Sequence, residues 1–263
     1  MKLEVKDLSF SYNSEKVLTD ITMQVQPMLT AVIGPNAAGK STLLKCFSGI
    51  LRPEGSLLFD GRQLNHYSRG ELQGIISYLP QDNSNRAVLT VYETVLLGRL
   101  NSLSWRVSDE DLEISMSIME DVGIASLARR PLNELSGGQQ QMVYIAQALV
   151  RNPQIFLMDE PTSNLDLAHQ FEIFSFIKSL TVKRGLTTLV ALHDLNMAAR
   201  FADRIVVLDR GMIVASGEPV EVLTADMIRR VYGVHARITI DTDGLPLVTP
   251  IHAVKKTLYL KAI

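Results

Sequence analysis

The sequence predicts an α/β fold in which a mostly parallel sheet is flanked by helices. Short apolar runs, typical of strands buried on both faces, occur at 30–33, 155–158, 187–192 and 204–208. Segments with helical spacing, at about 167–183 and 194–202, separate the last three runs, as the crossovers of a parallel sheet require. A glycine-rich turn follows the first run and leads into a helix from Lys40 to Ser48. A strand, a loop and a helix in this order open an α/β unit.

The first 25 residues predict a small antiparallel sheet with one exposed face. Leu3 and Val5 alternate with charged residues, and Ile21, Met23 and Val25 alternate with polar ones. Alternation with a period of two is the pattern of a strand that is buried on one side. We therefore expect this segment to precede the parallel sheet as a separate antiparallel layer.

The stretch from about 90 to 151 shows helical spacing and no convincing strand. Thr90 and Glu93 form a capping-box pair, and Ser108 is placed to open a second helix. On that second helix Leu112, Met116 and Met119 fall on one stripe, which we expect to face the core. The methionines in general follow helical spacing and are expected in the core.

These patterns divide the chain into three parts. Residues 1–83 and 152–235 form one split core, and residues 84–151 form a helical insertion within it. Residues 236–263 form a small β appendage, because Ile238 and Ile240 precede a turn at Asp243 and Gly244.

Composition excludes several classes of protein. The net charge is −2, from 26 Lys plus Arg and 28 Asp plus Glu, which gives no basic surplus for a nucleic-acid backbone. A lone cysteine, Cys46, allows neither an intrachain disulfide nor a thiolate metal cluster, and we expect it to be an inert core residue. The first ten residues lack the apolar stretch of a signal peptide, and no window reaches the roughly 18 consecutive apolar residues of a membrane span.

The segment from Gly34 to Ser41 reads GPNAAGKS and matches the phosphate-loop pattern GxxxxGK[ST]. It lies directly after a predicted buried strand and before a helix, as the pattern requires. Glycines let consecutive backbone N–H groups turn inward, and the helix beginning near Lys40 adds its positive end to the same anion. Lys40 supplies a charge between the β- and γ-phosphates, and the Ser41 hydroxyl suits Mg²⁺.

A second acidic site is expected, because Mg²⁺ needs carboxylate support and an attacking water needs a base. The strand IFLMDE, residues 155–160, ends in two carboxylates. Asp159 is placed to approach the metal, directly or through a water, and Glu160 is placed to face the water that attacks the γ-phosphorus. Two acidic residues at the end of a strand are a weak signal by themselves. The phosphate loop in the same chain favours the interpretation that they belong to a nucleotide site.

The segment LSGGQ, Leu135 to Gln139, is the most specific feature, since a chance match has a probability of about three in ten thousand. It also resembles a helix start, with Ser136 as cap and Gln139 at the capping-box position. Gly137 and Gly138 argue against a cap alone, because glycine lowers helix stability by up to about 1 kcal/mol relative to alanine. We interpret the pair as a place where a ligand approaches the backbone.

With these motifs the chain resembles the ATP-binding subunit of an ATP-binding-cassette (ABC) transporter, over about residues 1–235 and in the family's order. The resemblance implies a phosphate-loop NTPase core with an N-terminal antiparallel β subdomain and a helical insertion. It assigns the phosphate-binding Walker A loop to Gly34, Pro35, Asn36, Ala37, Ala38, Gly39, Lys40, Ser41 and Thr42. It assigns the signature to 135–139, the Walker B strand to 155–160 and the D-loop to Asp166. Position 37 departs from the family, in which Gly is most usual there, so a positive φ at this residue would strain Ala37.

The same resemblance implies roles for single residues. Glu160, His193 and Gln81 are the implied catalytic residues, as general base, switch histidine and Q-loop glutamine. Ser41, Gln81 and Asp159 are the implied Mg²⁺ ligands, and Tyr12 is the aromatic residue on the adenine. Without the resemblance, each of three residues also has a purely structural interpretation. His193 could be a buried histidine with its hydrogen bonds satisfied, Gln81 an ordinary loop amide and Tyr12 a packing residue of the first sheet.

The resemblance further implies how ATP is shared. Two such subunits pair head to tail, and Ser136, Gly137, Gly138 and Gln139 of one close on the γ-phosphate held by the other, with Asp166 at the seam. The cofactors are ATP and Mg²⁺. The implied partners are a second, identical subunit, a transmembrane permease and, indirectly, an extracytoplasmic substrate-binding protein, with no nucleic acid.

A finer likeness concerns cargo. Residues 193–219 and the LLGR at 97–100 are most similar to importer ATPases for iron-siderophore, haem or cobalamin complexes. The implied function is ATP hydrolysis that powers uptake of a metal chelate, from the cytoplasmic face of the cell membrane. Importers of molybdate or of other metals remain open, as does an ABC ATPase that acts on DNA or ribosomes.

Overall fold

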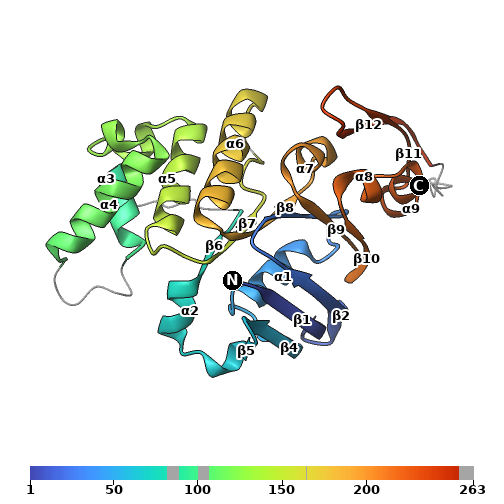
Figure 1. The fold of residues 1–263 in the computed structure, drawn as a ribbon, viewed down its shortest axis with the longest axis horizontal. Coiled ribbons are helices and arrows are strands. Elements are labelled where there is room, and N and C mark those ends of the chain that lie inside the picture. Colours follow the sequence, from blue (N-terminus) through green and yellow to red (C-terminus); the bar gives the residue numbers. More distant parts are fainter. Residues whose placement is uncertain (82–88, 100–106, 164, 255–263) are drawn as a thin grey trace, which may run out of the picture.

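The computed structural model describes residues 1–81, 89–99, 107–163 and 165–254 (Figure 1). Its centre is a six-stranded sheet in which five neighbouring strands run parallel and an edge strand is antiparallel. In spatial order the strands are β10 (Met212–Gly217), β9 (Arg204–Asp209), β3 (Leu29–Ile33), β8 (Thr187–Leu192), β7 (Ile155–Asp159) and β6 (Ile76–Leu79).

The apolar runs form the buried middle of this sheet, which confirms the predicted mostly parallel sheet. Every residue of β3, β7 and β8 is buried. In β3, Leu29, Ala31 and Ile33 pack into one core and Val32 packs into another on the opposite face. A strand covered on both faces needs apolar side chains at successive positions, which explains the continuous runs.

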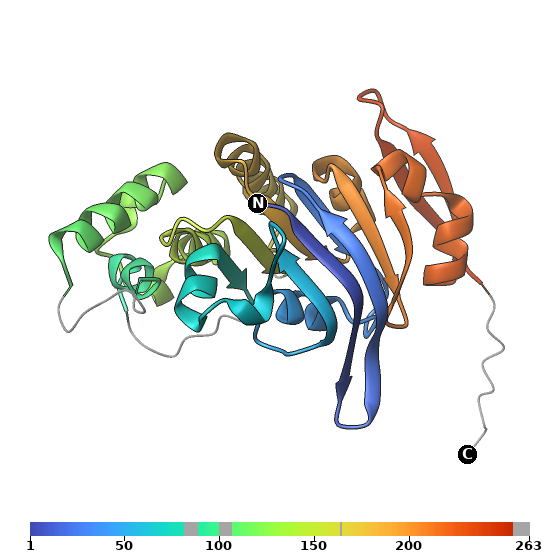
Figure 2. The ribbon, with the colours of Figure 1, turned by 60° about the horizontal axis from the view of Figure 1, so that its bottom comes forward.

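A four-stranded antiparallel sheet lies over one face of the central sheet and covers α1 (Figure 2). Its strands are β2 (Glu15–Val25), β1 (Leu3–Tyr12), β4 (Glu54–Phe59) and β5 (Arg62–Gln63). Leu3 and Val5 on β1, and Ile21 and Val25 on β2, point inward. The predicted alternation is confirmed, while β4 and β5 were not predicted.

Nine helices in the described part of the chain pack on both faces of the central sheet, on one another and on the C-terminal strands. They are α1 (Lys40–Phe47), α2 (Arg69–Ile75), α3 (Val91–Leu97), α4 (Asp109–Val122), α5 (Gly137–Leu149), α6 (Leu167–Arg184), α7 (Leu195–Phe201), α8 (Pro219–Val222) and α9 (Ala225–Tyr232). The larger apolar core runs from the sheet face under α6 and α7 into α3, α4 and α5. The division at residues 84, 152 and 236 stays a prediction, because this core continues across all three boundaries. None of the helices in the described part of the chain combines the length and the apolar character of a bilayer crossing.

The stripe predicted for α4 is wrong for two of its three residues. Met119 is buried, but Leu112 and Met116 are 37% and 38% exposed. The buried face is rotated, because Asp111 and Ser115 face inward in place of the expected apolar residues. Both are satisfied: Asp111 pairs with Arg99, and the Ser115 hydroxyl donates to the Asp111 carbonyl at 2.7 Å. A buried polar residue with its partners in place is tolerated where an unpartnered one is not. Met212 on β10 is likewise 46% exposed, so the methionines are not uniformly core.

The tail forms a two-stranded hairpin, β11 (Val234–Ile240) and β12 (Pro246–Ala253), as predicted, starting two residues before the predicted boundary. It lies at the opposite end of the molecule from α3, α4 and α5 (Figures 1 and 2). Asn196 on α7 joins it by two hydrogen bonds to the Val248 backbone, of 2.8 and 3.2 Å. Arg200, one turn further, pairs with Asp241 and Asp243.

Candidate active site

Four polar segments meet at one edge of the central sheet. The phosphate loop follows β3, Asp159 and Glu160 lie at the end of β7, His193 follows β8, and Gln81 follows β6. These strands are neighbours in the order β3, β8, β7, β6 and run parallel, so their carboxyl ends lie at the same edge. In open α/β sheets this edge is where ligands bind.

The backbone of the phosphate loop requires its two glycines. A Cβ on Gly34 would collide with the backbone carbonyl of Leu208, and Gly39 has a φ of 103° where it caps α1. Ala37 has a φ of 61°, so its backbone is in the left-handed region, and the strain considered in the sequence analysis is present. A residue with a Cβ pays about 1–2 kcal/mol in that region. The tip at Asn36 and Ala37 is exposed, whereas Ala38 is buried.

Lys40 bends back across the loop. Its ammonium donates to the carbonyls of Gly34 and Pro35 at 2.8 and 3.1 Å, and the residue is 5% exposed. Burial lowers the pKa of Lys40, and the carboxylates of Glu160 and Asp159 oppose that shift. The side chain is therefore held inside the loop, with its donors on loop carbonyls.

Ser41 and Asp159 come together from different elements. The Ser41 hydroxyl, in the first turn of α1, donates to Asp159 Oδ1 at 3.0 Å, and the Tyr78 hydroxyl donates to Oδ2 at 3.3 Å. Burial raises the pKa of Tyr78, and the nearby Asp159 carboxylate adds to the shift. Tyr78 thus remains a neutral donor. A hydroxyl and a carboxylate side by side form the all-oxygen donor set that suits Mg²⁺.

Glu160 is held from two sides. Gln81 donates its amide N–H to Oε2 at 2.9 Å, and His193 Nε2 contacts Oε1. The Glu160 side chain is 11% exposed, and its φ is 49°. A left-handed backbone at a nonglycine residue is uncommon, and it turns Glu160 away from the strand that positions Asp159. The three residues predicted to be catalytic therefore form one contact group.

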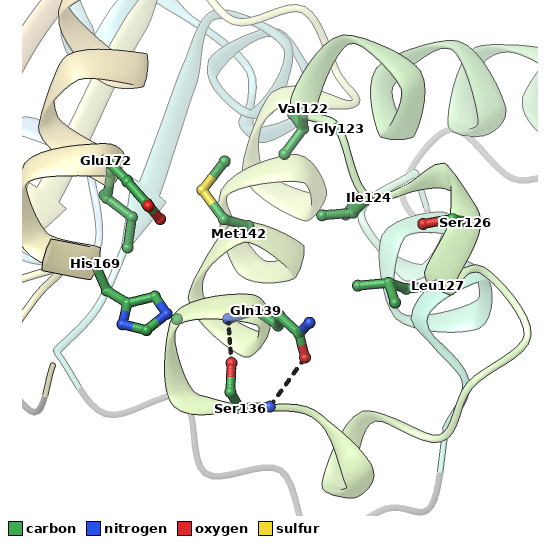
Figure 3. A pocket seen from close by; sticks show the side chains of 12 residues that line it. Val122, Gly123, Ile124, Ser126, Leu127, Ser136, Gln139, Met142, His169 and Glu172 are labelled. Atoms are coloured by element: carbon green, nitrogen blue, oxygen red, sulfur yellow. Dashed lines mark hydrogen bonds between the residues drawn. The ribbon is translucent and has the colours of Figure 1, made fainter. Parts of the chain in front are cut away.

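The signature segment, residues 135–139, begins α5 with the predicted capping box. The Gln139 N–H donates to Ser136 Oγ at 3.3 Å, and the Ser136 N–H donates to Gln139 Oε1 at 3.1 Å (Figure 3). Ser136 and Gly137 are exposed and Gly138 is buried. A Cβ on Gly138 would overlap the His169 ring, with Cγ at 3.0 Å. Packing against His169 is thus a further reason for glycine at 138, and the approach of a ligand to both glycines stays a prediction.

Asp166 caps α6 next to this segment. It accepts the His169 N–H at 2.9 Å, and its side chain is 67% exposed. The signature segment and Asp166 form a second group, separate from the phosphate-loop group. Within the described part of the chain no hydrogen bond or ion pair joins the signature segment to residues 34–42.

Tyr12 lies at the end of β1 and is 44% exposed. Its ring meets Phe10 edge-on, with centroids 4.9 Å apart. One ring edge is therefore packed, and the exposed part of the ring is accessible to a flat ligand. Cys46 is fully buried, and burial raises the pKa of its thiol to about 12, as expected for an inert core residue.

Two residues of this region were missed from the sequence. Tyr78 contacts Asp159 from β6, a strand too short and too mixed in character to be predicted. His169 contacts both Asp166 and Gly138 and belongs to none of the motifs identified in the sequence. Its position three residues after Asp166, on the same face of a predicted helix, was the available signal.

Comparison with known families identifies the family of the chain. The family model described as ABC transporter matches residues 18–163, more than half of the chain. The chain belongs to the ABC transporter family. It is an ATP-binding and ATP-hydrolysing subunit of that family.

Relatives match this ABC subunit from end to end. The ABC transporter ATP-binding protein MJ0089 of Methanocaldococcus jannaschii is 40% identical over 253 residues, covering 95% of this chain and 98% of the relative. The iron(3+)-hydroxamate import ATP-binding protein FhuC of Bacillus subtilis is 37% identical over 243 residues, covering 91% and 90%.

Solved structures agree with this membership. An ABC transporter described as of the metal-chelate type, in an inward-facing conformation, matches with a TM-score of 0.83 and 26% identity, over 95% of this chain and 97% of that one. The dimeric bacterial ABC transporter cassette MJ0796 matches with a TM-score of 0.71 and 28% identity, over 82% and 98%. Both confirm the α/β fold, with its parallel-rich sheet and helices.

Proposed function

We propose that this ABC subunit powers the import of a metal chelate of the iron-siderophore, haem or cobalamin type. The observation that carries the proposal is the match to FhuC over 91% of this chain and 90% of FhuC, which is named for iron(3+)-hydroxamate import. The match to a structure of the metal-chelate type supports the same class of cargo.

We assign residues 34–42 to the ATP phosphates. Backbone N–H groups of the loop and of the first turn of α1 suit the phosphate oxygens. Lys40 has to leave the carbonyls of Gly34 and Pro35 and turn its ammonium toward the β- and γ-phosphates. Its cationic form is favoured there by the nearby Asp159 and Glu160. Tyr12 stacks on the adenine.

The oxygens of Ser41 and Asp159 fit a Mg²⁺ ligand set, with Gln81 as the third assigned ligand. When bound, Mg²⁺ neutralises charge on the β- and γ-phosphate oxygens. Tyr78 holds the second oxygen of Asp159 and thereby fixes the orientation of that carboxylate.

Glu160 accepts the proton of the water that attacks the γ-phosphorus. Its carboxylate is already oriented by Gln81 and His193, which supports this role. For the water to reach Glu160, at least one of these contacts has to open. We assign to His193 the γ-phosphate contact that replaces its contact with Glu160, which makes the base available when ATP is in place.

Two identical subunits then complete the sites. Because the phosphate-loop group and the signature group are separate in one chain, we assign Ser136, Gly137, Gly138, Gln139 and Asp166 to the ATP of the partner subunit. The dimeric cassette among the similar structures supports this pairing. The dimer works with a transmembrane permease, on the cytoplasmic face of the membrane, and the permease receives cargo from an extracytoplasmic binding protein.

The test is affinity purification of tagged Glu160→Gln subunit from detergent-solubilised membranes of the host, with MgATP present, followed by mass spectrometry. We expect a permease with many membrane-spanning helices, encoded with a binding protein for an iron chelate, haem or cobalamin. The Lys40→Ala subunit, which should not close on ATP, is the matched control. Recovery of ribosomal proteins or DNA-repair factors without a permease would contradict the proposal, and a molybdate permease would change the cargo.

A further inference from the structure

We propose that His169 is a positioning residue that joins Asp166 to the signature segment. Its imidazole helps to set the distance between two segments that we assign to the ATP of the partner subunit, beside Leu165, whose Cδ2 packs toward Gly137. The inference rests on the proposed function, which places both segments at the dimer seam.

The first contact fixes the ring from the side of Asp166. His169 Nδ1 lies 2.8 Å from Asp166 Oδ1 and 2.9 Å from Oδ2. A carboxylate is acceptor-only, so Nδ1 carries a proton in this arrangement. The backbone N–H of His169 donates to the same carboxylate at 2.9 Å. These hydrogen bonds, first of all the one from the backbone, hold the pKa of Asp166 below its usual range.

The second contact is on the opposite edge of the ring. His169 Cδ2 faces the Cα of Gly138 closely enough that a Cβ there would overlap it, with Nε2 at 3.2 Å from the added atom. Figure 3 shows the ring extending from α6 toward the first turn of α5. The ring therefore fills the space between the two helices at the point where the signature segment starts.

The surroundings explain why this contact matters for position. A cavity of about 390 Å³ opens beside the ring, lined by Ser136, Gln139, Met142 and Glu172 among others (Figure 3). Because part of the space around the start of α5 is open, a shift of the signature segment toward α6 is resisted by particular side chains, Leu165 against Gly137 and His169 against Gly138. The His169 ring resists it directly, and Asp166 holds the ring.

Helix capping and positioning can be separated at this residue. The cap of α6 uses the backbone N–H of residue 169, which every substitution except proline keeps. A side-chain change therefore removes the link to Gly138 and the Nδ1 bond while the N-terminal cap persists. His169→Asn keeps a side-chain N–H near the place of Nδ1 and loses the ring edge. His169→Phe keeps a ring against Gly138 and loses the donor.

The experiment compares His169→Ala, His169→Asn and His169→Phe with the wild type and with Glu172→Ala, an exposed residue one turn along α6 that lines the same cavity. We expect the kcat for ATP to fall about tenfold or more in His169→Ala, since small misplacements of reacting groups reduce rates strongly. The KM for ATP should change less than twofold, because the ATP of each subunit binds to its own phosphate loop. The kcat of His169→Asn and of His169→Phe should lie between those of His169→Ala and the wild type. The kcat of Glu172→Ala should equal that of the wild type.

A second readout does not depend on activity. Amide hydrogen exchange at residues 137–141 in the subunit without nucleotide should rise several-fold in His169→Ala and not in Glu172→Ala. Exchange at the wild-type rate in His169→Ala would overturn the proposal, even if the wild-type subunit proved inactive as an ATPase. Failure of the positioning role is thereby distinguished from failure of the proposed function. A loss of thermal stability with unchanged kcat and unchanged exchange would assign His169 a merely structural role and would also overturn it.

Discussion

Glu160 shows how much of this site depends on single contacts. Its carboxylate is almost enclosed, with Gln81 on one oxygen and His193 on the other, and its backbone is held in a left-handed conformation. Strain of this kind persists where surrounding structure enforces it, and it is concentrated at functional sites. The residue is thus prepared for one orientation, which a general base requires.

Glu160→Gln should lower the kcat for ATP by about 10² to 10⁴, the usual contribution of a general base. The amide keeps the shape of the side chain and cannot accept the proton, so binding of MgATP should persist. Steady-state hydrolysis and equilibrium ATP binding measure the two effects. Glu113→Gln, on the exposed face of α4, is the control, and unchanged turnover in Glu160→Gln would remove the assignment.

Ala37→Gly should raise the free energy of unfolding by up to about 1 kcal/mol. The left-handed φ of 61° costs a residue with a Cβ about 1–2 kcal/mol, which glycine avoids. Part of this stabilisation is offset, because glycine loses more conformational entropy than alanine on folding. Ala37→Val should be destabilising, since a β-branched residue fits this region less well. Urea unfolding measures both. Ala168→Gly, in the first turn of α6, should be neutral or destabilising. An equal increase in the free energy of unfolding for Ala37→Gly and Ala168→Gly would contradict the strain argument.

Tyr12→Ala should weaken ATP binding about tenfold, because stacking of a base on an aromatic ring contributes roughly 1–3 kcal/mol. The kcat at saturating ATP should change little, since Tyr12 lies outside the contact group of Glu160. Titration calorimetry with ATP gives the affinity. Tyr12→Phe should bind as the wild type does, and an Ala variant with wild-type affinity would exclude Tyr12 from the site.

At the scale of elements, α7 links the active site to the C-terminal hairpin. Asp194, directly after His193, caps the start of α7. On the first turn, the Asn196 amide donates to the Val248 carbonyl and accepts from the Val248 N–H. The Arg200 pairs with Asp241 and Asp243 are exposed, and exposed pairs contribute little. The docking of the hairpin therefore rests on the Asn196 hydrogen bonds together with the apolar packing of Val248 in the larger core.

Asn196→Ala should reduce the free energy of unfolding by about 1–3 kcal/mol, because two partly buried backbone groups lose their partner. Amide exchange at Val248 and its neighbours in β12 should increase more than exchange in β3 or β7. Asn133→Ala, an exposed asparagine at the other end of the molecule, is the control. Exchange in the hairpin at the wild-type rate would show that it docks by other means.

Elements were predictable where one physical signal dominated. The buried strands β3, β7, β8 and β9 followed from their apolar runs, and the starts of α3, α4 and α5 followed from capping residues. The edge strand β10 and the strands β4 and β5 are partly exposed and carry no continuous apolar run, and β6 has only four residues, of which Ser77 and Tyr78 are not aliphatic. The face of α4 was missed because the Asp111 ion pair, which decides it, involves a residue outside the helix.

At the scale of the whole molecule, the residues that we assign to the ATP site lie in two groups. Residues that follow β3, β6, β7 and β8 meet at one sheet edge, and their motifs made that group predictable from the sequence. The signature segment and Asp166 meet through His169, which no motif indicated. Contacts between elements distant in sequence, such as Tyr78 with Asp159, depend on the sheet order and so could not be read from the chain alone.

A head-to-tail dimer makes a specific prediction about mixtures of variants. Lys40→Ala disables the phosphate loop and Ser136→Arg disables the signature segment, so each variant alone should hydrolyse ATP very slowly. In a mixed dimer the intact phosphate loop of the Ser136→Arg subunit faces the intact signature of the Lys40→Ala subunit, which restores one complete site. Steady-state hydrolysis by the mixture should therefore exceed the sum of the two separate rates. If both groups served the ATP of their own chain, mixing would restore nothing, and the assignment of Ser136 and Asp166 to the partner's ATP would have to be abandoned.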